Sequence, residues 1–435
     1  MPGIDPSFPF VRFSDHRLAN GLRVIIAPDH LAPVVAVNVW YDVGSKHERP
    51  GKTGFAHLFE HLMFQGSRHV AKAEHMAIVQ GAGGVCNGTT FFDRTNYFET
   101  LPSHWLDLGL WLEADRMATL LDAVNQENLD NQRDVVKNEK RQSYDNRPYG
   151  SFYERTVAAV FAPEHPYHHT PIGSMDDLDA ASLEDVRDFF RTYYVPNNAV
   201  VSIVGDVEPG EALASAARYF EPIAPGSVPP LGDLSLAAHI GQGSREVVQD
   251  AVPLVRVHFG FRTPPFGTPA FDALEVATQI LSGGQGSRLH RRLVREQRVA
   301  QDAAAFLLPL VDGGSLLAGW ATVRPESDPA IVEAAYLAEL DLVAREPVTD
   351  DELARAGALI ESDELAALGR VEEVADRLGM YATLFDRPGL VNEQLARYLA
   401  VDANAILAAS ADVFRDDNRA VLTYVPGGSV GEAAA

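Results

Sequence analysis

The second half of the 435-residue chain repeats the first half in outline, and this repeat restricts the folds open to the chain. In the first half, a β-branched and aromatic run at 34–41 is followed by a loop and an apolar helical segment that ends at Gly66. The same succession recurs between residue 254 and Gly284. We therefore predict an α+β fold of two homologous halves related by internal duplication. Each half should be an α/β-sandwich-like layer in which helices pack on a mixed or antiparallel sheet.

A Pro- and Gly-rich stretch separates the two halves. Residues 227–235 read Ser-Val-Pro-Pro-Leu-Gly-Asp-Leu-Ser, a composition typical of a linker. We predict an N-terminal domain over 1–226, a linker over 227–241 and a C-terminal domain over 242–435. This division agrees with the chain length, because 435 residues exceed one ordinary core and suit two domains of roughly 200 residues.

The composition excludes several classes of partner. The chain has 60 Asp and Glu against 36 Lys and Arg, a formal net charge of -24, which repels nucleic acid and anionic membrane surfaces but can attract basic or unfolded peptides. No run of 18 apolar residues is present, so we expect no membrane insertion. The single cysteine, Cys86, excludes an intrachain disulfide. Residues 1–6 show no signal-peptide pattern, so we expect a cytoplasmic location, or a periplasmic one if a signal peptide was removed.

The segment 54–64, Gly-Phe-Ala-His-Leu-Phe-Glu-His-Leu-Met-Phe, places three polar residues in an apolar run. In a helix, His57 and His61 lie at i and i+4 on one face, and Glu60 borders that face. Two imidazoles at this spacing can hold one metal ion, and a carboxylate beside them can take a proton from an attacking water. The alternative is an apolar helix whose histidines are only hydrogen-bonded in the core.

The duplicated helix argues for the metal site. Aligning the glycines that end the two helical segments sets the polar residues of the first against different residues in the second, namely His57, Glu60 and His61 against Glu275, Thr278 and Gln279. If the histidines only filled a core, the copy could be expected to keep similar residues. The second helix therefore retained the packing and lost the ligands.

Several segments together resemble the pitrilysin/insulinase-type zinc metallopeptidases, including bacterial homologues of the mitochondrial processing peptidases. His-x-x-Glu-His is the inverzincin spacing of this family. The resemblance runs nearly end to end and is carried by residues 54–66, 83–97, 134–139, 165–167, 194–198, 204–206 and 283–289. It implies a zinc-dependent endopeptidase that hydrolyses peptides or unstructured polypeptides in a closed chamber, with Glu60 as the general base.

The resemblance also implies the remaining site residues. In this family the third zinc ligand is a glutamate on a separate helix, roughly 75 to 80 residues after the second histidine. Glu139 lies 78 residues after His61 and would complete a Zn²⁺ site with His57, leaving a fourth position for water. Gln132 stands where many members have a second glutamate, and its neutral amide can still hydrogen-bond beside the ligands.

Asn87 and Gly88 match the family's edge-strand positions, where the substrate is held as an added β-strand. A turn residue after a glycine run is the other interpretation of Asn87.

One part of the family's site is missing from the second half. Self-sufficient members carry an Arg and a Tyr seven residues apart, and the matching positions here are Val294 and Gln301. The resemblance therefore implies a heterodimer with a homologous subunit that lacks the zinc motif and supplies the Arg/Tyr pair. The alternatives are a non-catalytic core or scaffold subunit of the same fold, and a metal-binding protein without peptidase activity.

Overall fold

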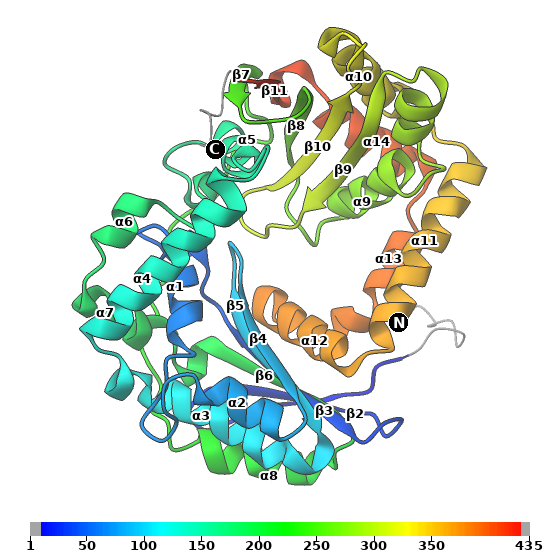
Figure 1. Ribbon diagram of the computed structural model, residues 1–435. Helices are drawn as coiled ribbons and strands as arrows, with labels where there is room; N and C mark the ends of the chain where they lie inside the picture. Colours follow the sequence, from blue (N-terminus) through cyan, green and yellow to red (C-terminus); the bar gives the residue numbers. More distant parts are fainter. Residues whose placement is uncertain (1–9, 428–435) are drawn as a thin grey trace. The chain divides into compact units, whose positions relative to one another are not determined.

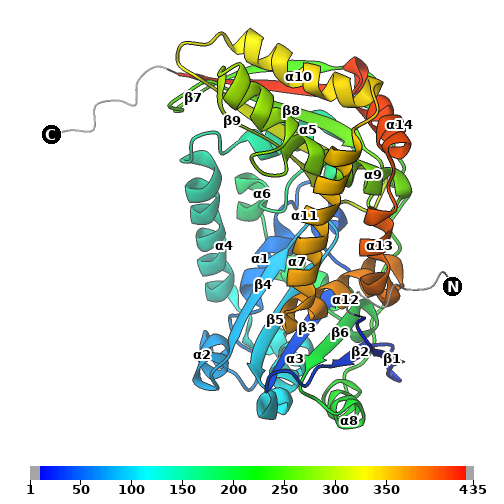
Figure 2. The same ribbon diagram turned by 90° about the vertical axis from the view of Figure 1, so that its right-hand side faces the viewer.

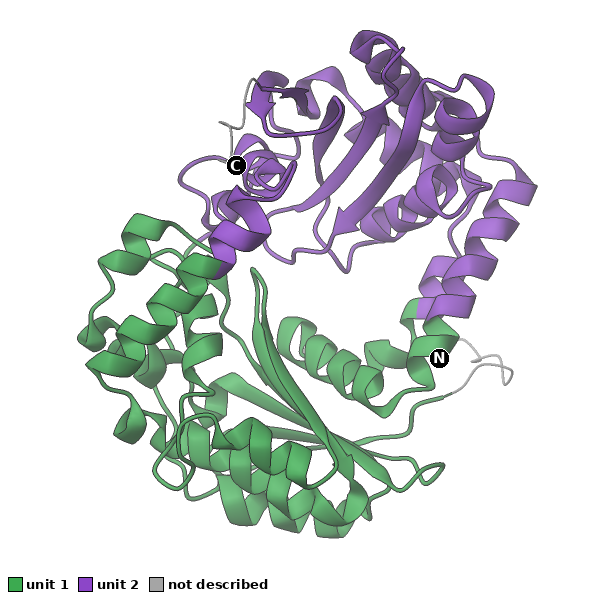
Figure 3. Ribbon diagram, in the orientation of Figure 1, with its two compact units in different colours: residues 1–138, 171–232, 364–394 green, residues 139–170, 233–363, 395–435 purple. Residues whose placement is uncertain are grey.

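The computed structural model describes residues 10–427, which form two compact units (Figure 1, Figure 3). Within the described residues, unit 1 comprises 10–138, 171–232 and 364–394, and unit 2 comprises 139–170, 233–363 and 395–427. One boundary between the two units, at residues 232 and 233, falls within the predicted linker. The divisions 1–226 and 242–435 of the sequence stay a prediction, and the segment 1–6 considered for a signal peptide lies outside the described residues.

Unit 1 is built on a six-stranded mixed sheet in the order β1-β2-β6-β3-β5-β4. The pair β2 and β6 is parallel, and the other pairs are antiparallel. The strands are β1 (Ser14–Arg17), β2 (Arg23–Pro28), β3 (Val34–Tyr41), β4 (Val85–Thr90), β5 (Thr95–Pro102) and β6 (Ala199–Gly205). The strand β4 forms one edge, so one side of its backbone is not paired within this sheet.

Unit 2 repeats this arrangement in a five-stranded sheet with the order β7-β11-β8-β10-β9. Its one parallel pair, β7 and β11, corresponds to β2 and β6, and the antiparallel pairs follow in the same sequence. The strands are β7 (Ser244–Asp250), β8 (Arg256–Thr263), β9 (Ala300–Leu308), β10 (Ser315–Val323) and β11 (Arg419–Pro426). The α+β class and the two homologous sheets with helices on them are confirmed.

Helices cover both sheets (Figure 2). Those of the first half are α1 (Phe55–Leu62), α2 (Glu74–Gly81), α3 (Leu106–Ala123), α4 (Gln126–Lys140), α5 (Phe152–Val160), α6 (Met175–Asp179), α7 (Leu183–Tyr193) and α8 (Pro209–Phe220). Those of the second half are α9 (Pro269–Ser282), α10 (Pro329–Arg345), α11 (Asp350–Leu368), α12 (Val371–Phe385), α13 (Gln394–Leu399) and α14 (Ala403–Val413). None of the described helices combines the length and the apolar character needed to cross a membrane.

Each unit takes one helix from the other half of the sequence. Helix α12 packs on β3 and β6 of unit 1, and helix α5 packs on β8 and β11 of unit 2. The contacts are complementary in size, because Gly379 of α12 faces Trp40 on its strand, whereas Gly260 on a strand of unit 2 faces Thr156 of α5. At this contact between helix and sheet, the glycine is thus on the helix in unit 1 and on the strand in unit 2.

We expect Gly379→Ala to destabilise the protein by about 1–3 kcal/mol, because the new methyl group would lie 2.6 Å from Cδ1 of Trp40. In an open helical position the same substitution stabilises, since alanine is the better helix former by about 1 kcal/mol. Gly210→Ala in α8 is the matched control, because nothing lies within 4 Å of its added Cβ. Urea unfolding of both variants measures the difference. Equal midpoints would contradict the close packing of α12 on the sheet.

Candidate metal centre and active site

The helix α1, which carries the two histidines, is fixed at its start by a carboxylate. Glu48 accepts hydrogen bonds from the backbone N–H of Gly54 (2.9 Å) and of Ala56 (2.7 Å), which would otherwise be unpaired at a helix N-terminus. On the buried side of the helix, the ring of Phe59 stacks on Phe189 and Tyr194 at centroid distances of 5.0 and 5.2 Å. This packing orients the polar face of α1 away from the core.

The helix α4, which carries Glu139, is held in place by buried apolar side chains and by hydrogen bonds from Arg133. Leu129 and Val136 are fully buried, and Arg133 donates from Nε to the carbonyl oxygen of Leu178 and from Nη2 to that of Ala181, both at 2.7 Å. Glu139 follows Val136 by three residues on the same continuous helix. Its position is therefore set by the packing of the preceding turns.

These two helices bring three ligating side chains together. One nitrogen each of His57 and His61 and one carboxylate oxygen of Glu139 lie within 4.8 Å of one another, and all three residues are half-buried. The imidazole rings have centroids 4.8 Å apart and planes at 80°. Zinc is bound about 2 Å from nitrogen and carboxylate donors, so one ion can reach all three with small side-chain adjustments. The donor set fits zinc and leaves a position for a fourth ligand.

Glu60 and the edge strand β4 lie beside this group. A Cβ built on Gly88 would be 3.2 Å from Cγ of Glu60, so only a glycine allows this close approach. Asn87 is exposed, and its Oδ1 accepts a hydrogen bond of 2.9 Å from the backbone N–H of Gly88. The hydrogen bond from Phe91 N to Arg94 O closes the β4–β5 hairpin. Alternation along an antiparallel ladder then directs the backbone groups of Gly88 to the free edge.

The other predicted positions, Gln132, Val294 and Gln301, are not part of the ligating group. Gln132 is buried, and its Nε2 donates to Oδ1 of Asn131 at 2.9 Å. Val294 is half-buried in the π-helical segment His290–Glu296, and Gln301 is exposed on β9. The hydrogen bonds of Gln132 within the described structure therefore do not reach the ligand group.

A second group of ligating side chains, which sequence reasoning missed, is fully buried in unit 1. His75 (α2), Glu99 (β5) and Glu113 (α3) have ligand atoms within 4.8 Å of one another. Nε2 of His75 lies 3.6 Å from Glu99 Oε2 and 4.0 Å from Glu113 Oε1, and Arg116 is bonded to both oxygens of Glu113. The three ligands come from separate elements, so no spacing in the sequence reveals them.

The net charge of this second group indicates whether a proton or a metal ion suits it better. Burial raises the pKa of both carboxyl groups, Glu99 and Glu113, to about 7 and lowers the pKa of His75 to about 3. With Arg116 charged, one proton on the carboxyl pair makes the group neutral, whereas a divalent ion would leave a net positive charge in the core. The charges of these four residues therefore favour a proton on the carboxyl pair over a divalent ion.

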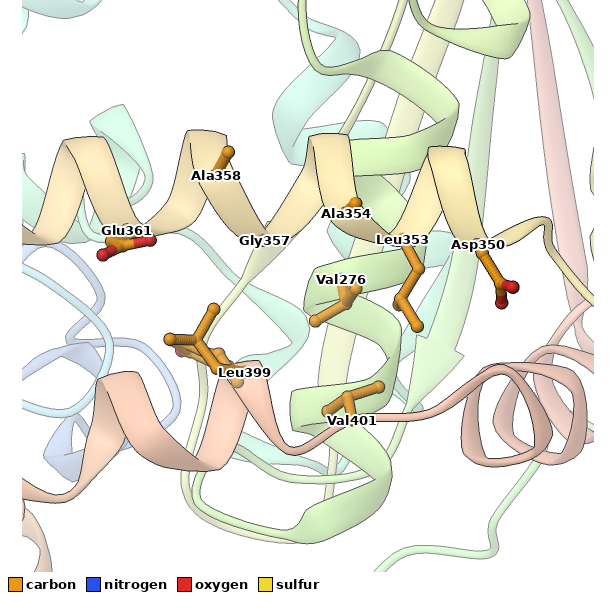
Figure 4. A pocket seen from close by; sticks show the side chains of 10 residues that line it. Val276, Asp350, Leu353, Ala354, Gly357, Ala358, Glu361, Leu399 and Val401 are labelled. Carbon is orange, nitrogen blue, oxygen red and sulfur yellow. The ribbon is translucent and has the colours of Figure 1, made fainter. Parts of the chain in front are cut away.

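Unit 2 has a surface groove of about 380 Å³ between α9, α11 and α13 (Figure 4). Leu353 and Leu399 point into it from opposite sides, and Val276 and Val401 also line it. None of the residues predicted from the sequence to act on a substrate lines this groove.

Comparisons with family models and with known sequences point to the same family. Residues 23–165 match the family model described as insulinase (peptidase family M16), and residues 180–359 match the one described as peptidase M16 inactive domain. The zinc protease PqqE of Helicobacter pylori is 30% identical over 412 residues, covering 94% of this chain and 92% of that protein. A probable mitochondrial-processing peptidase subunit beta of Arabidopsis thaliana is 24% identical over 423 residues, covering 94% and 77%.

Solved structures agree with the sequence comparison. The crystal structure of a protease from Helicobacter pylori matches with a TM-score of 0.90 and 29% identity, covering 96% of this chain and all of that one. A peptidase M16 inactive domain from Pseudomonas fluorescens has a TM-score of 0.86 at 15% identity, covering 96% and 99%, and shares the fold. The two family models and the relative that is 30% identical along most of its length establish that this chain belongs to peptidase family M16, the insulinase family.

Proposed function

We propose that this chain is the zinc-binding subunit of an endopeptidase that hydrolyses peptides or unstructured polypeptides in a closed chamber. The observation that carries the proposal is the convergence of His57, His61 and Glu139, whose ligand atoms lie within 4.8 Å of one another beside Glu60. The names of the relatives as zinc proteases support the choice of metal.

The chain's own residues have distinct roles in this proposal. His57, His61 and Glu139 would hold a zinc ion, which when bound acts as a Lewis acid toward water and the scissile carbonyl. Glu60 accepts the proton of the attacking water and later delivers it to the leaving amine. Gly88 offers its backbone groups at the free edge of β4, and the Asn87 side chain must leave the Gly88 N–H before an added strand can bind there.

A homologous partner completes the site in this proposal. Val294 and Gln301 cannot supply the Arg and Tyr side chains that self-sufficient relatives use, so a subunit without the zinc motif would contribute them in a heterodimer. The chain purified alone should then cleave peptides far more slowly than the chain mixed with such a paralogue. Full turnover by the isolated chain or by a homodimer would contradict this part of the proposal.

Metal analysis tests the proposed site directly. We expect one zinc per chain, removal of both the metal and the cleavage of an unfolded peptide by a chelator, and restoration of both by added zinc. Glu139→Ala should weaken zinc binding by more than about 100-fold, because even the loss of an outer hydrogen-bond partner of a ligand costs about 10- to 100-fold. Glu127→Ala, an exposed position on the same helix, is the control.

Two results would reject this function. A chain that binds no zinc in the presence of excess metal would remove the site itself. Zinc binding without chelator-sensitive cleavage, even with the partner present, would favour a scaffold subunit, a role in keeping with the inactive-domain model that matches residues 180–359.

A further inference from the structure

Arg94 is bonded to the edge strand next to the residue that faces Glu60, and it does not belong to the metal group. It occupies the turn between β4 and β5, where Nη1 donates to the carbonyl oxygen of Thr89 and to Oδ1 of Asn96, both at 2.9 Å. Its guanidinium carbon lies 4.9 Å from the centre of the Trp40 ring. Thr89 is the neighbour of the glycine that faces Glu60, so Arg94 ties down the strand segment next to that carboxylate.

Asp376, on α12, supplies a matching negative charge. Its Oδ1 accepts hydrogen bonds from Nδ2 of Asn38 (3.2 Å), Nε1 of Trp40 (3.0 Å) and Nδ2 of Asn96 (3.0 Å). Asn96 also accepts from Arg94, so the two charged residues share a partner. Burial lowers the pKa of Arg94, and the negative charges of Asp376 and Glu60 oppose this effect.

In unit 2, the contact between helix α5 and its sheet, which corresponds to that of α12 in unit 1, is built differently. There α5 places Phe152 on the ring of His258, with centroids 4.7 Å apart and planes at 18°. The strand residue Arg256 packs 4.0 Å from the centre of the Tyr149 ring and donates to Oγ1 of Thr322. Aromatic packing is therefore sufficient to hold a helix on this sheet. The helix–sheet contact that contains the charged residues Arg94 and Asp376 occurs in the unit that contains His57, Glu60 and His61.

We propose that Arg94 is a positioning residue for Glu60 and that Asp376 anchors Arg94. The guanidinium supplies a fixed positive charge that keeps the Glu60 carboxylate and the adjoining β4 segment in place, and Asp376 holds that charge from a helix 282 residues further along the chain. This inference rests on the proposed function, since it assigns Glu60 a role in proton transfer. Preorganised charges of this kind act on turnover rather than on substrate affinity.

Kinetics of the zinc-loaded, peptide-cleaving assembly test this role. We expect Arg94→Met to lower kcat by about 10- to 100-fold while KM changes by less than about 3-fold. Arg94→Lys keeps the charge and should recover most of the loss, and Asp376→Asn should lower kcat in the same direction by a smaller factor. Zinc content should stay at one per chain throughout. Arg256→Met, a ring-packed arginine of unit 2, is the control and should leave kcat unchanged.

A double-mutant cycle tests the coupling without any assay of cleavage. Unfolding midpoints of wild type, Glu60→Gln, Arg94→Met and the double variant should be non-additive, because removing the Glu60 charge matters only while Arg94 carries its own. Additive midpoints, or kcat of Arg94→Met equal to that of Arg256→Met, would overturn the proposal. Absence of cleavage by wild type would instead reject the proposed function, and the cycle would still decide whether Arg94 and Glu60 interact.

Discussion

Glu60→Gln is expected to lower kcat by about 10²- to 10⁴-fold while the chain still binds one zinc, because glutamine keeps the shape of the side chain but cannot accept the proton of the attacking water. The three ligating residues His57, His61 and Glu139 are unchanged in this variant, so metal content separates lost chemistry from lost binding. Cleavage of an unfolded peptide by the zinc-loaded, partner-complemented chain measures the first quantity, and metal analysis of the same sample measures the second.

The matched control for this experiment is Glu184→Gln, an exposed glutamate in the first turn of α7. Its turnover and zinc content should equal those of wild type. If the Glu60 variant kept more than about a tenth of the wild-type kcat, Glu60 would not be the general base, because proton transfer by a positioned side chain contributes at least about 100-fold.

The second large effect concerns the buried proton of the Glu99 and Glu113 pair. The folded-state pKa of these groups is about 7, above the ordinary value of 4.5, so the folded protein keeps a proton that the unfolded chain releases. Their contribution to stability is complete below pH 4.5 and is lost as the pH rises through 7. Counting one shared proton, the loss is about 3 kcal/mol, since one pKa unit corresponds to about 1.4 kcal/mol.

Glu99→Gln removes this dependence, because a neutral amide needs no proton to remain in the core. At pH 8 the variant should be more stable than wild type, and the difference should shrink as the pH falls toward 5. Urea unfolding at several pH values measures this difference. The groups that face Glu99 are His75, Glu113 and Arg116, with Cys86 opposite it on β4.

The stability of the variant must be compared with that of wild type at each pH, because the buried histidines change stability with pH in the opposite direction. Burial lowers the pKa of His47, His75 and His258 to about 3, so each contributes stability that is lost as the pH falls below its ordinary value of 6.5. The contributions of His47 and His258 are common to both proteins and cancel in the difference, whereas His75 faces the substituted residue. A difference that does not vary between pH 5 and 8 would mean that Glu99 and Glu113 hold no shared proton.

Local sequence patterns were sufficient for the elements that form the site. The β-branched run at 34–41 is the strand β3, and the segment 54–64 contains the helix α1, in which the i and i+4 spacing places His57 and His61 on one face. The repeat of the pattern beyond residue 254 corresponds to a second sheet with the same strand order. Periodicity determines these features because it depends only on the geometry of a single helix or strand.

The role of Glu139 could be predicted from the sequence, but not from a local pattern. Its spacing from His61 acquires meaning only through the resemblance to a family, because a distance of 78 residues has no local geometry. In the structure, the packing of α4 brings its carboxylate to the histidines.

Only the tertiary structure decided the remaining features. Helix α12 lies on the sheet of unit 1 rather than on that of its own half, and the hydrogen bonds that link Arg94 to Asp376 through Asn96 follow from that placement. The buried group of Glu99, Glu113 and His75 likewise joins a strand and two helices. A sequence pattern states which face of an element is apolar but not which surface will cover it, so side chains that meet across such contacts are visible only after folding.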